Sequence, residues 1–151
     1  MDIKIVPKAF TVEYPEVVNV VETNIRICED FDLDAYKDNV YPSSYEFIAT
    51  WDTGAMISVI SIKAVKELGL TPTGKEDVCH GGGVYVANKY LVNMFLPNDI
   101  VFVSLEVLAM PISVDVLIGM DIISKGDFAI TASEGKTVFS FQVPSTNKII
   151  F

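Results

Sequence analysis

Residues 45–61 read YEFIATWDTGAMISVIS. Asp52 stands between two apolar segments rich in β-branched and aromatic residues, and Gly54 follows two positions later. Such residues favour strands, so the stretch predicts two strands, over residues 45–51 and 56–61, joined by a turn that carries the acidic residue. Burying an ionised carboxylate is costly unless hydrogen-bond donors satisfy it. Asp52 is therefore either satisfied by local donors or held in place for chemistry.

Two further segments follow in the sequence. Residues 79–86 read CHGGGVYV, and residues 115–121 read DVLIGMD. Three successive glycines, between His80 and Val84, predict the tip of a hairpin over residues 77–94. The second segment places a glycine after an apolar strand, just before a predicted short helix. A plain Asx turn would explain the Asp-Thr-Gly sequence alone, but it does not explain the other two segments.

Together the three segments resemble the signatures of the retropepsin-like aspartic proteases. These signatures are an Asp-Thr-Gly-Ala active-site loop, a glycine-rich flap, and two apolar residues followed by glycine. Their order and approximate spacing match over residues 45–131. The resemblance implies an all-β fold, a single-lobe acid-protease barrel with one or two short helices. It also implies that residues 1–151 form one such domain, with an N-terminal extension of about residues 1–44.

The resemblance implies an aspartic endopeptidase that hydrolyses peptide or protein substrates. Proteases of this type use two carboxylates that share one proton, one acting as base on a water and the other as acid. This chain has one Asp-Thr-Gly sequence, so the second Asp52 is expected from a second copy in a homodimer. The implied catalytic residues are Asp52, Thr53 and Gly54. The implied substrate-binding residues are Ala55, Gly81, Gly82, Gly83 and Val84.

Each of these residues has an expected role. In the family, the hydroxyl that matches Thr53 locks the two active-site loops across the dimer. Gly54 allows close backbone approach, and Ala55 lines the floor beside the substrate. The glycine-rich tip is expected to close over an extended peptide and exclude water.

Two positions depart from the viral members of the family. Those members carry an Asp directly after Asp-Thr-Gly-Ala and an Arg after the second glycine, and the two form an ion pair. This chain has Met56 and Met120 there. A contact between the two methionines is expected to replace the pair, and the dimer geometry is left open.

Length, composition and charge narrow the classes of function. The chain has 151 residues, of which 50% are hydrophobic, which suits one domain with a real core. Its net charge of −9 argues against binding nucleic acid or a membrane through a basic face. No metal-ligand spacing is present, so no metal or cofactor is expected. Absence of a signal-peptide pattern and of a long apolar run favours a cytoplasmic location.

Several alternatives stay open at this stage. The same fold without activity would serve as a dimeric peptide-binding or scaffold module. Phosphoryl transfer is disfavoured because Gly54 stands where such sites need a second acidic residue. The acidic segment over residues 29–44 is expected to be a solvated loop, with a Ca²⁺ site as the alternative. Cys28 and Cys79 are expected to be free thiols, and one disulfide is the alternative.

The remaining elements follow from hydrophobic pattern and turn signals. A short helix is expected over residues 61–69, capped by Ser61 and stopped by Gly69. Another is expected over residues 121–125, capped by Asp121. The expected strands elsewhere cover residues 17–27, 99–110, 114–118, 128–132 and 137–143.

Overall fold

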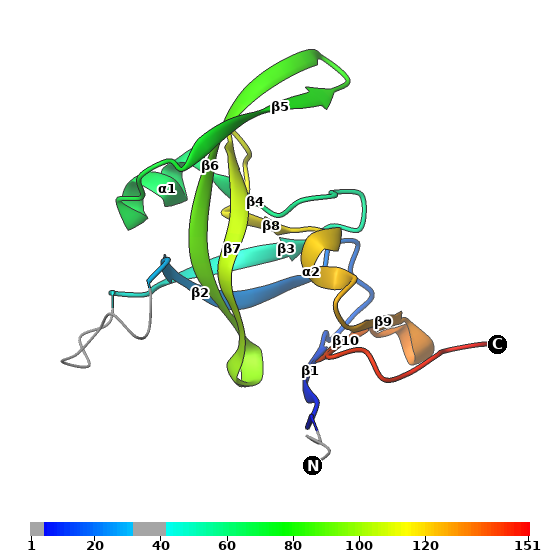
Figure 1. Cartoon of the computed structure of the whole chain (residues 1–151). Helices are drawn as coiled ribbons and strands as arrows, with labels where there is room; N and C mark the ends of the chain where they lie inside the picture. The colour runs from blue at the N-terminus through cyan, green and yellow to red at the C-terminus, as the bar shows by residue number, and fades with distance from the viewer. Residues whose placement is uncertain (1–4, 32–41) are drawn as a thin grey trace.

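The computed structural model describes residues 5–31 and 42–151 (Figure 1). The ten strands of this part of the chain are β1 (Lys8–Glu13), β2 (Glu22–Glu29), β3 (Tyr45–Trp51), β4 (Val59–Ser61), β5 (Gly74–His80), β6 (Gly83–Leu96), β7 (Ile100–Met110), β8 (Val116–Ile118), β9 (Asp127–Thr131) and β10 (Val138–Val143). The two α-helices are α1 (Ile62–Leu68) and α2 (Met120–Ile123). Short 3₁₀ turns lie at Pro97–Asp99 and Ser133–Gly135.

Six strands close into a barrel. Hydrogen-bonded neighbours follow the order β2-β3-β8-β4-β7-β6, and β6 pairs back with β2. The closing pairing is antiparallel and sets Arg26 opposite Phe95 and Glu29 opposite Val92. β3 with β8 and β4 with β7 are the parallel pairs. The expected all-β, single-lobe acid-protease barrel with two short helices is confirmed.

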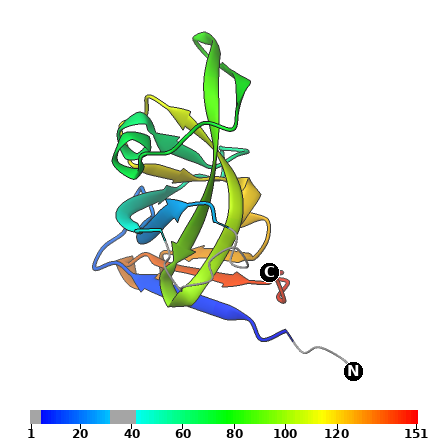
Figure 2. The same cartoon turned by 60° about the vertical axis from the view of Figure 1, so that its left-hand side comes forward.

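A long hairpin projects from one end of the barrel. β5 and β6 pair antiparallel from Gly74 opposite Lys89 to His80 opposite Gly83. β6 runs on into the barrel wall, while β5 has no other neighbour among the described strands. Figures 1 and 2 both show this hairpin rising clear of the body. The predicted hairpin is confirmed, and both of its strands are longer than the sequence suggested.

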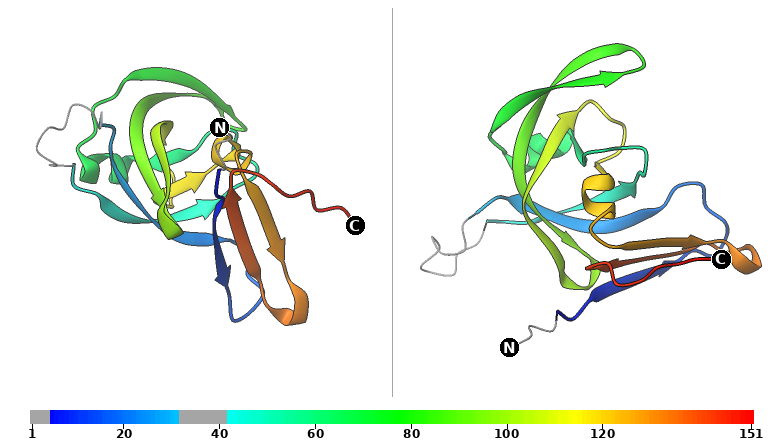
Figure 3. Two further views of the ribbon diagram at one scale, coloured as in Figure 1. Left: turned by 60° about the horizontal axis from the view of Figure 1, so that its bottom comes forward. Right: turned by 45° about the vertical axis from the view of Figure 1, so that its right-hand side comes forward.

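A three-stranded sheet of β1, β10 and β9 packs at the other end (Figure 3, left). Its aromatic side chains meet Trp51, the last residue of β3. The Trp51 ring centroid lies 4.9 Å from that of Phe141 and 5.0 Å from that of Phe139. Phe10 of β1 contacts Phe139 edge-on at 5.7 Å. The aromatic contacts place this sheet directly behind the strand that leads to Asp52.

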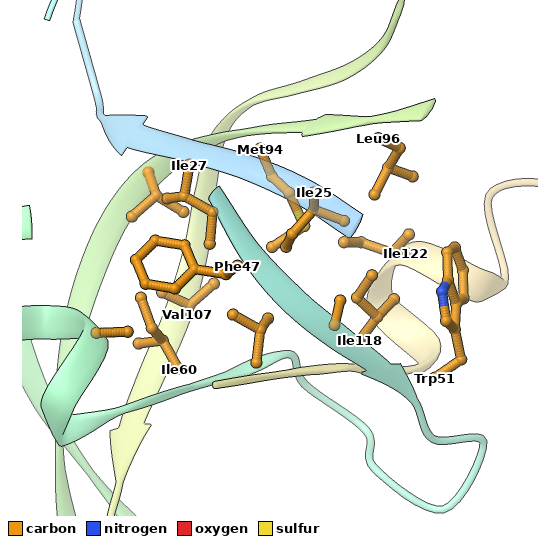
Figure 4. Packing of buried hydrophobic residues seen from close by; sticks show 14 of the residues in the cluster. Ile25, Ile27, Phe47, Trp51, Ile60, Met94, Leu96, Val107, Ile118 and Ile122 are labelled. Carbon is orange, nitrogen blue, oxygen red and sulfur yellow. The ribbon is translucent and has the colours of Figure 1, made fainter. Parts of the chain in front are cut away.

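The barrel interior is filled with branched aliphatic side chains (Figure 4). Ile27, Ile60 and Ile118 are fully buried, and Phe47 is 5% exposed. Each such side chain contributes about 1.5–3 kcal/mol relative to an exposed one. The Trp51 indole N–H donates to Thr23 Oγ1 at 2.9 Å, so the one polar group of that large side chain is satisfied inside the core.

Helix α1 begins and ends where the sequence predicts. The Ser61 hydroxyl accepts a hydrogen bond from the Ala64 N–H, and Gly69 adopts the left-handed conformation with φ 64°. Ala64 and Val65 are buried. Helix α2 starts at Met120, with Gly119 as its cap, one residue earlier than predicted. The strand expected from residue 56 is shorter, because residues 56–58 form an irregular bend and pairing begins only at Val59.

The N-terminal part differs most from the sequence prediction. The Val-rich segment from residue 17 was expected to be extended, but β2 begins at Glu22. Residues 17–21 are instead held by isolated bonds, such as Val18 N–H to Thr137 Oγ1 at 3.0 Å and Trp51 N–H to the Val21 carbonyl at 3.0 Å. β1 was not predicted at all. Both regions depend on partners far away in the sequence.

Most of the predicted acidic loop, with its alternative Ca²⁺ site, falls on residues 32–41 and lies outside the described residues. Cys28 is buried, Cys79 is exposed, and both are free thiols. Burial raises the pKa of the Cys28 thiol. Across residues 5–31 and 42–151, none of the helices combines the length and apolar character of a membrane span.

Candidate active site

Asp52 sits at the end of β3, in a turn that satisfies it locally. Its main-chain N–H donates to the Ile118 carbonyl at 2.9 Å, which ties the turn to β8. Its Oδ1 accepts a hydrogen bond from the Gly54 N–H at 2.8 Å. A Cβ on Gly54 would lie 3.1 Å from that same Oδ1, so a side chain there would crowd the carboxylate. The second carboxylate oxygen accepts no hydrogen bond from another described residue, which leaves it open to an incoming group.

The second sequence signature lies directly against the first. Met120 N–H donates to the Ala55 carbonyl at 2.8 Å, and Asp121 N–H donates to the Met56 carbonyl at 3.2 Å. A Cβ added to Gly119 would lie 2.8 Å from the Ala55 carbonyl oxygen, closer than real Cβ atoms approach. Only glycine therefore lets the start of α2 approach the Asp52 loop so closely.

A polar pair of the buried Ser58 and the half-buried Asp121 strengthens this junction. The Asp121 carboxylate accepts hydrogen bonds from the Ser58 hydroxyl at 2.7 Å and from the Ser58 N–H at 2.9 Å. Ser58 Oγ in turn accepts a hydrogen bond from the Gly119 N–H at 3.1 Å. Ser58 is fully buried. The sequence predicted Asp121 only as a helix cap, and no local pattern signals a pair 63 residues apart.

A cavity of about 540 Å³ opens beside Asp52. Figure 1 and the right panel of Figure 3 show the loop between β3 and β4 beneath the projecting hairpin. The cavity is lined by Asp52, Gly54, Ala55, Met56, Ile57, Val59, Glu76, Asp77, Val78, Cys79, Leu108, Met110, Ile112 and Leu117. Most of these side chains are apolar, and the lining carries carboxylates but no Lys, Arg or His.

The cavity brings together three of the residues expected at the site, Asp52, Gly54 and Ala55. Thr53, the three tip glycines and Val84 do not line it in the single chain. Val84 is 65% exposed and pairs with Cys79, whereas Val78 and its partner Tyr85 share the face that packs on Val59 and Leu108. The sequence did not assign these apolar lining residues, because their strands meet only in the folded barrel.

The two methionines that depart from the viral pattern flank the loop. Met56 is 82% exposed and Met120 is 37% exposed. Within the described residues, no three His, Cys, Asp or Glu side chains are grouped as a metal ion would require. The chemistry available in one chain is thus one copy of the Asp52 carboxylate at a largely apolar cavity, beside an exposed rim.

Comparison with known proteins gives a consistent result. A retropepsin-like aspartic protease from Rickettsia conorii shares the fold at a TM-score of 0.53 and 12% identity, over 94% of this chain and 98% of that one. Simian foamy virus (mac) protease aligns at a TM-score of 0.44 and 18% identity, over 69% of this chain and 92% of that one. No curated protein sequence matches.

A longer viral protein also aligns. The foamy viral protease–reverse transcriptase, solved in complex with an RNA/DNA hybrid, matches at a TM-score of 0.46 and 19% identity over 70% of this chain. This chain spans only 12% of that protein. The sequence profile of a family described as aspartyl protease matches residues 44–122, more than half of the chain. The chain belongs to the aspartyl protease family, and its fold is the one seen in the Rickettsia conorii retropepsin-like protease.

Proposed function

We propose that the protein is an aspartic endopeptidase that acts as a homodimer. Its active site contains two Asp52 carboxylates, one from each subunit, and a water between them. The observation that carries this proposal is the position of Asp52 at the cavity, with one carboxylate oxygen free of protein donors among the described residues. One carboxylate alone cannot act as base and acid at once, so a second copy completes the site.

The exposed rim around the loop supports an interface there. Thr53 is exposed, and the largely exposed Met56 follows it by three residues. If a two-fold axis passes between the two Asp52 loops, Thr53 and Met56 of one subunit would contact the same residues, or their neighbours, in the second subunit. Methionine is unbranched and adaptable, so Met56 and Met120 suit an apolar contact in place of an ion pair.

The reaction follows from the pair of carboxylates. One Asp52 takes a proton from the water, whose oxygen attacks the scissile carbonyl carbon, while the other protonates the carbonyl oxygen. The resulting tetrahedral intermediate breaks its C–N bond as the amine nitrogen takes a proton from the carboxyl that first acted as base. As the C–N bond breaks, one hydroxyl of the intermediate gives its proton to the other Asp52 and becomes the carbonyl of the new carboxylic acid. The pair again holds one proton, so no cofactor is consumed.

The hairpin is proposed to act as the flap. β5 presents a free edge over the cavity, and an extended peptide can add to such an edge through main-chain hydrogen bonds. The turn residues Gly81 and Gly82 lie beyond the cavity and would reach over the substrate in the dimer. We place residues 1–151 in one protease domain on this basis, with β1 and β2 contributed by the N-terminal extension.

Replacement of Asp52 by Asn tests the activity. Asp52→Asn is nearly isosteric, so it should abolish cleavage of a peptide library while the far-UV circular dichroism and the unfolding curve stay unchanged. Asp99→Asn is the matched control, because Asp99 lies outside the cavity and Asn tolerates its left-handed backbone, with φ 56°. Full activity in Asp52→Asn would overturn the proposal. Peptide binding by a wild type that never cleaves would favour the binding-module alternative.

A further inference from the structure

The charged side chains that line the candidate cavity are all acidic. Asp52, Glu76 and Asp77 line it, and the rest of the lining is apolar, small or, at Cys79, a thiol. Asp52 is assigned to the reaction, so Glu76 and Asp77 are left without a role. The two lie on β5, the edge strand of the hairpin, where an extended substrate would run.

Glu76 lies on the cavity face of that strand. It pairs with Ala87, and Val78 pairs with Tyr85, so all four residues share one face of the hairpin. Ala87 and Val78 belong to the cluster that includes Val59 and Leu108. Asp77 alternates to the opposite face, opposite Val86, so its side chain is less well placed for a ligand in the cavity.

The charge of Glu76 is only partly compensated. Lys89 Nζ lies 3.8 Å from Glu76 Oε2 but 3.1 Å from Glu106 Oε1, so the lysine is held mainly by Glu106. Glu106 is the main reason that the pKa of Lys89 is raised. Glu76, Lys89 and Glu106 together carry one net negative charge. Glu76 can therefore pair with a second cation. Its side chain is 41% exposed, which leaves room for one.

The spacing along β5 defines a pattern for the substrate. Val78 and Glu76 are two residues apart on one face, which is about 7 Å in a strand. A peptide added to the β5 edge has the same repeat, so its residues at positions i and i+2, or i and i−2, face the same side. One of these would rest on the apolar floor beside Val78, and the other would meet Glu76.

We propose that Glu76 selects a Lys or Arg side chain two positions away from the apolar residue that occupies the cavity floor. This inference rests on the proposed function, because it assumes that the substrate is an extended peptide in this cavity. The ammonium or guanidinium group would pair with the Glu76 carboxylate, in competition with Lys89. The substrate class is thus a peptide with an apolar and a basic residue separated by one position.

Paired peptides measure the selection. Every peptide has one Leu at the cleavage site. In the first pair the second residue before the Leu is Lys in one peptide and Met in the other, and in the second pair the same change is made at the second residue after the Leu. The Lys peptide of one orientation should be cleaved with a kcat/KM about fivefold higher than its Met partner, as expected for a partly exposed ion pair. Equal rates for Lys and Met in both orientations would overturn the inference.

Two variants should move this preference in opposite directions. Glu76→Gln should reduce the Lys-over-Met ratio to about one, while Lys89→Met should raise it because the internal competitor is gone. Glu134→Gln removes one negative charge in the Ser133–Gly135 turn, outside the cavity lining, and should leave the ratio unchanged. A ratio that falls equally in Glu76→Gln and Glu134→Gln would show only the general attraction of an acidic protein.

Binding to the Asp52→Asn protein separates this inference from the proposed catalysis. Fluorescence anisotropy with the same labelled peptides should show tighter binding of the Lys peptide, and the difference should shrink at 1 M salt. If the wild type cleaves no peptide but the Lys peptide still binds more tightly than the Met peptide, the protease proposal is refuted and the Glu76 subsite stands. Cleavage without any Lys preference in rate or binding would refute the subsite alone.

Discussion

The carboxylate of Asp52 receives a hydrogen bond from its own loop, but the loop itself is held by residues far along the chain. Ser58 and Asp121 form the buried part of that support, and Gly119 permits the close approach. The sequence predicted Asp52, Gly54 and Ala55 as site residues from their motif, and they line the cavity. It did not predict Ser58, because a serine in an apolar run carries no sign of a partner 63 residues away.

Loss of the Ser58 hydroxyl should be costly. Ser58→Ala leaves the Gly119 N–H without its acceptor and removes one of the two hydrogen bonds to Asp121 Oδ1, the other of which comes from the Ile122 N–H. The free energy of unfolding should therefore fall by about 1–3 kcal/mol. Ser140→Ala is the control, since its hydroxyl bonds only Thr11 on an exposed face. Urea denaturation should show the larger loss for Ser58→Ala. An equal or smaller loss would mean that the junction does not stabilise the loop.

The local sequence pattern predicted those helices and strands whose pairing partners are near in the sequence, or whose ends carry a capping or turn residue. Helix α1 has a serine cap and a glycine stop, and β9 and β10 flank a polar turn, so each is legible in the sequence. β1 reads KAFTVE, a six-residue segment in which three residues are apolar, no larger a share than in the chain as a whole. It is a strand because it pairs with β10 over residues 138–143, at the far end of the chain. The Val-rich residues 17–20 show the converse. Their composition favours a strand, but they have no partner strand and do not form one.

The hairpin tip allows a sharp test of the proposed flap. Gly83 has φ 125°, which side chains rarely adopt, whereas Gly81 has ordinary backbone angles and open space around it. Gly83→Ala should therefore shift the tip and lower kcat/KM several-fold, with a strain of roughly 1–3 kcal/mol confined to the turn. Gly81→Ala, the matched variant at the same tip, adds a methyl group without that strain and should lower kcat/KM less. Identical kinetics for the two variants would argue against a lid function for this turn.

The segment over residues 145–147, which follows β10, is held in place by the carboxylate of Asp127 in β9. Asp127 accepts hydrogen bonds from the Ser145 hydroxyl, from the Thr146 and Asn147 N–H groups at 3.0 Å, and from the side chains of Asn147 and Gln142. The Ser145 bond above all lowers the pKa of Asp127 from 3.8 to about 2. Because the pKa is depressed in the folded state, the stabilisation is complete above pH 3.8 and disappears as pH falls through about 2.

Hydrogen exchange can follow this anchor. At pH 5 the amides of Thr146 and Asn147 should be protected in the wild type and exchange faster in Asp127→Asn, while amides of the barrel strands stay unchanged. In the wild type the same loosening should occur only near pH 2. Loss of protection at pH 4, where Asp127 is still ionised, would show that other contacts hold this segment.

The whole molecule shows what a single chain leaves unfinished. The barrel, the cavity and the hairpin are complete within one copy, yet the copy offers one Asp52 and an exposed rim at Thr53 and Met56. The single Asp-Thr-Gly sequence predicts the need for a partner. It does not predict how the partner docks, since Met56 and Met120 replace the charges that would have suggested a geometry.

Subunit mixing tests most directly whether two copies of Asp52 make one active site. A fixed amount of wild type is mixed with an equal amount of Asp52→Asn, allowed to exchange subunits, and assayed with substrate in excess. Random pairing puts half of the wild-type chains into mixed dimers, so activity should fall to about half, whereas active Glu134→Gln added instead should raise it. Activity that is unchanged by Asp52→Asn, once mixed dimers have been detected by mass, would contradict a shared site.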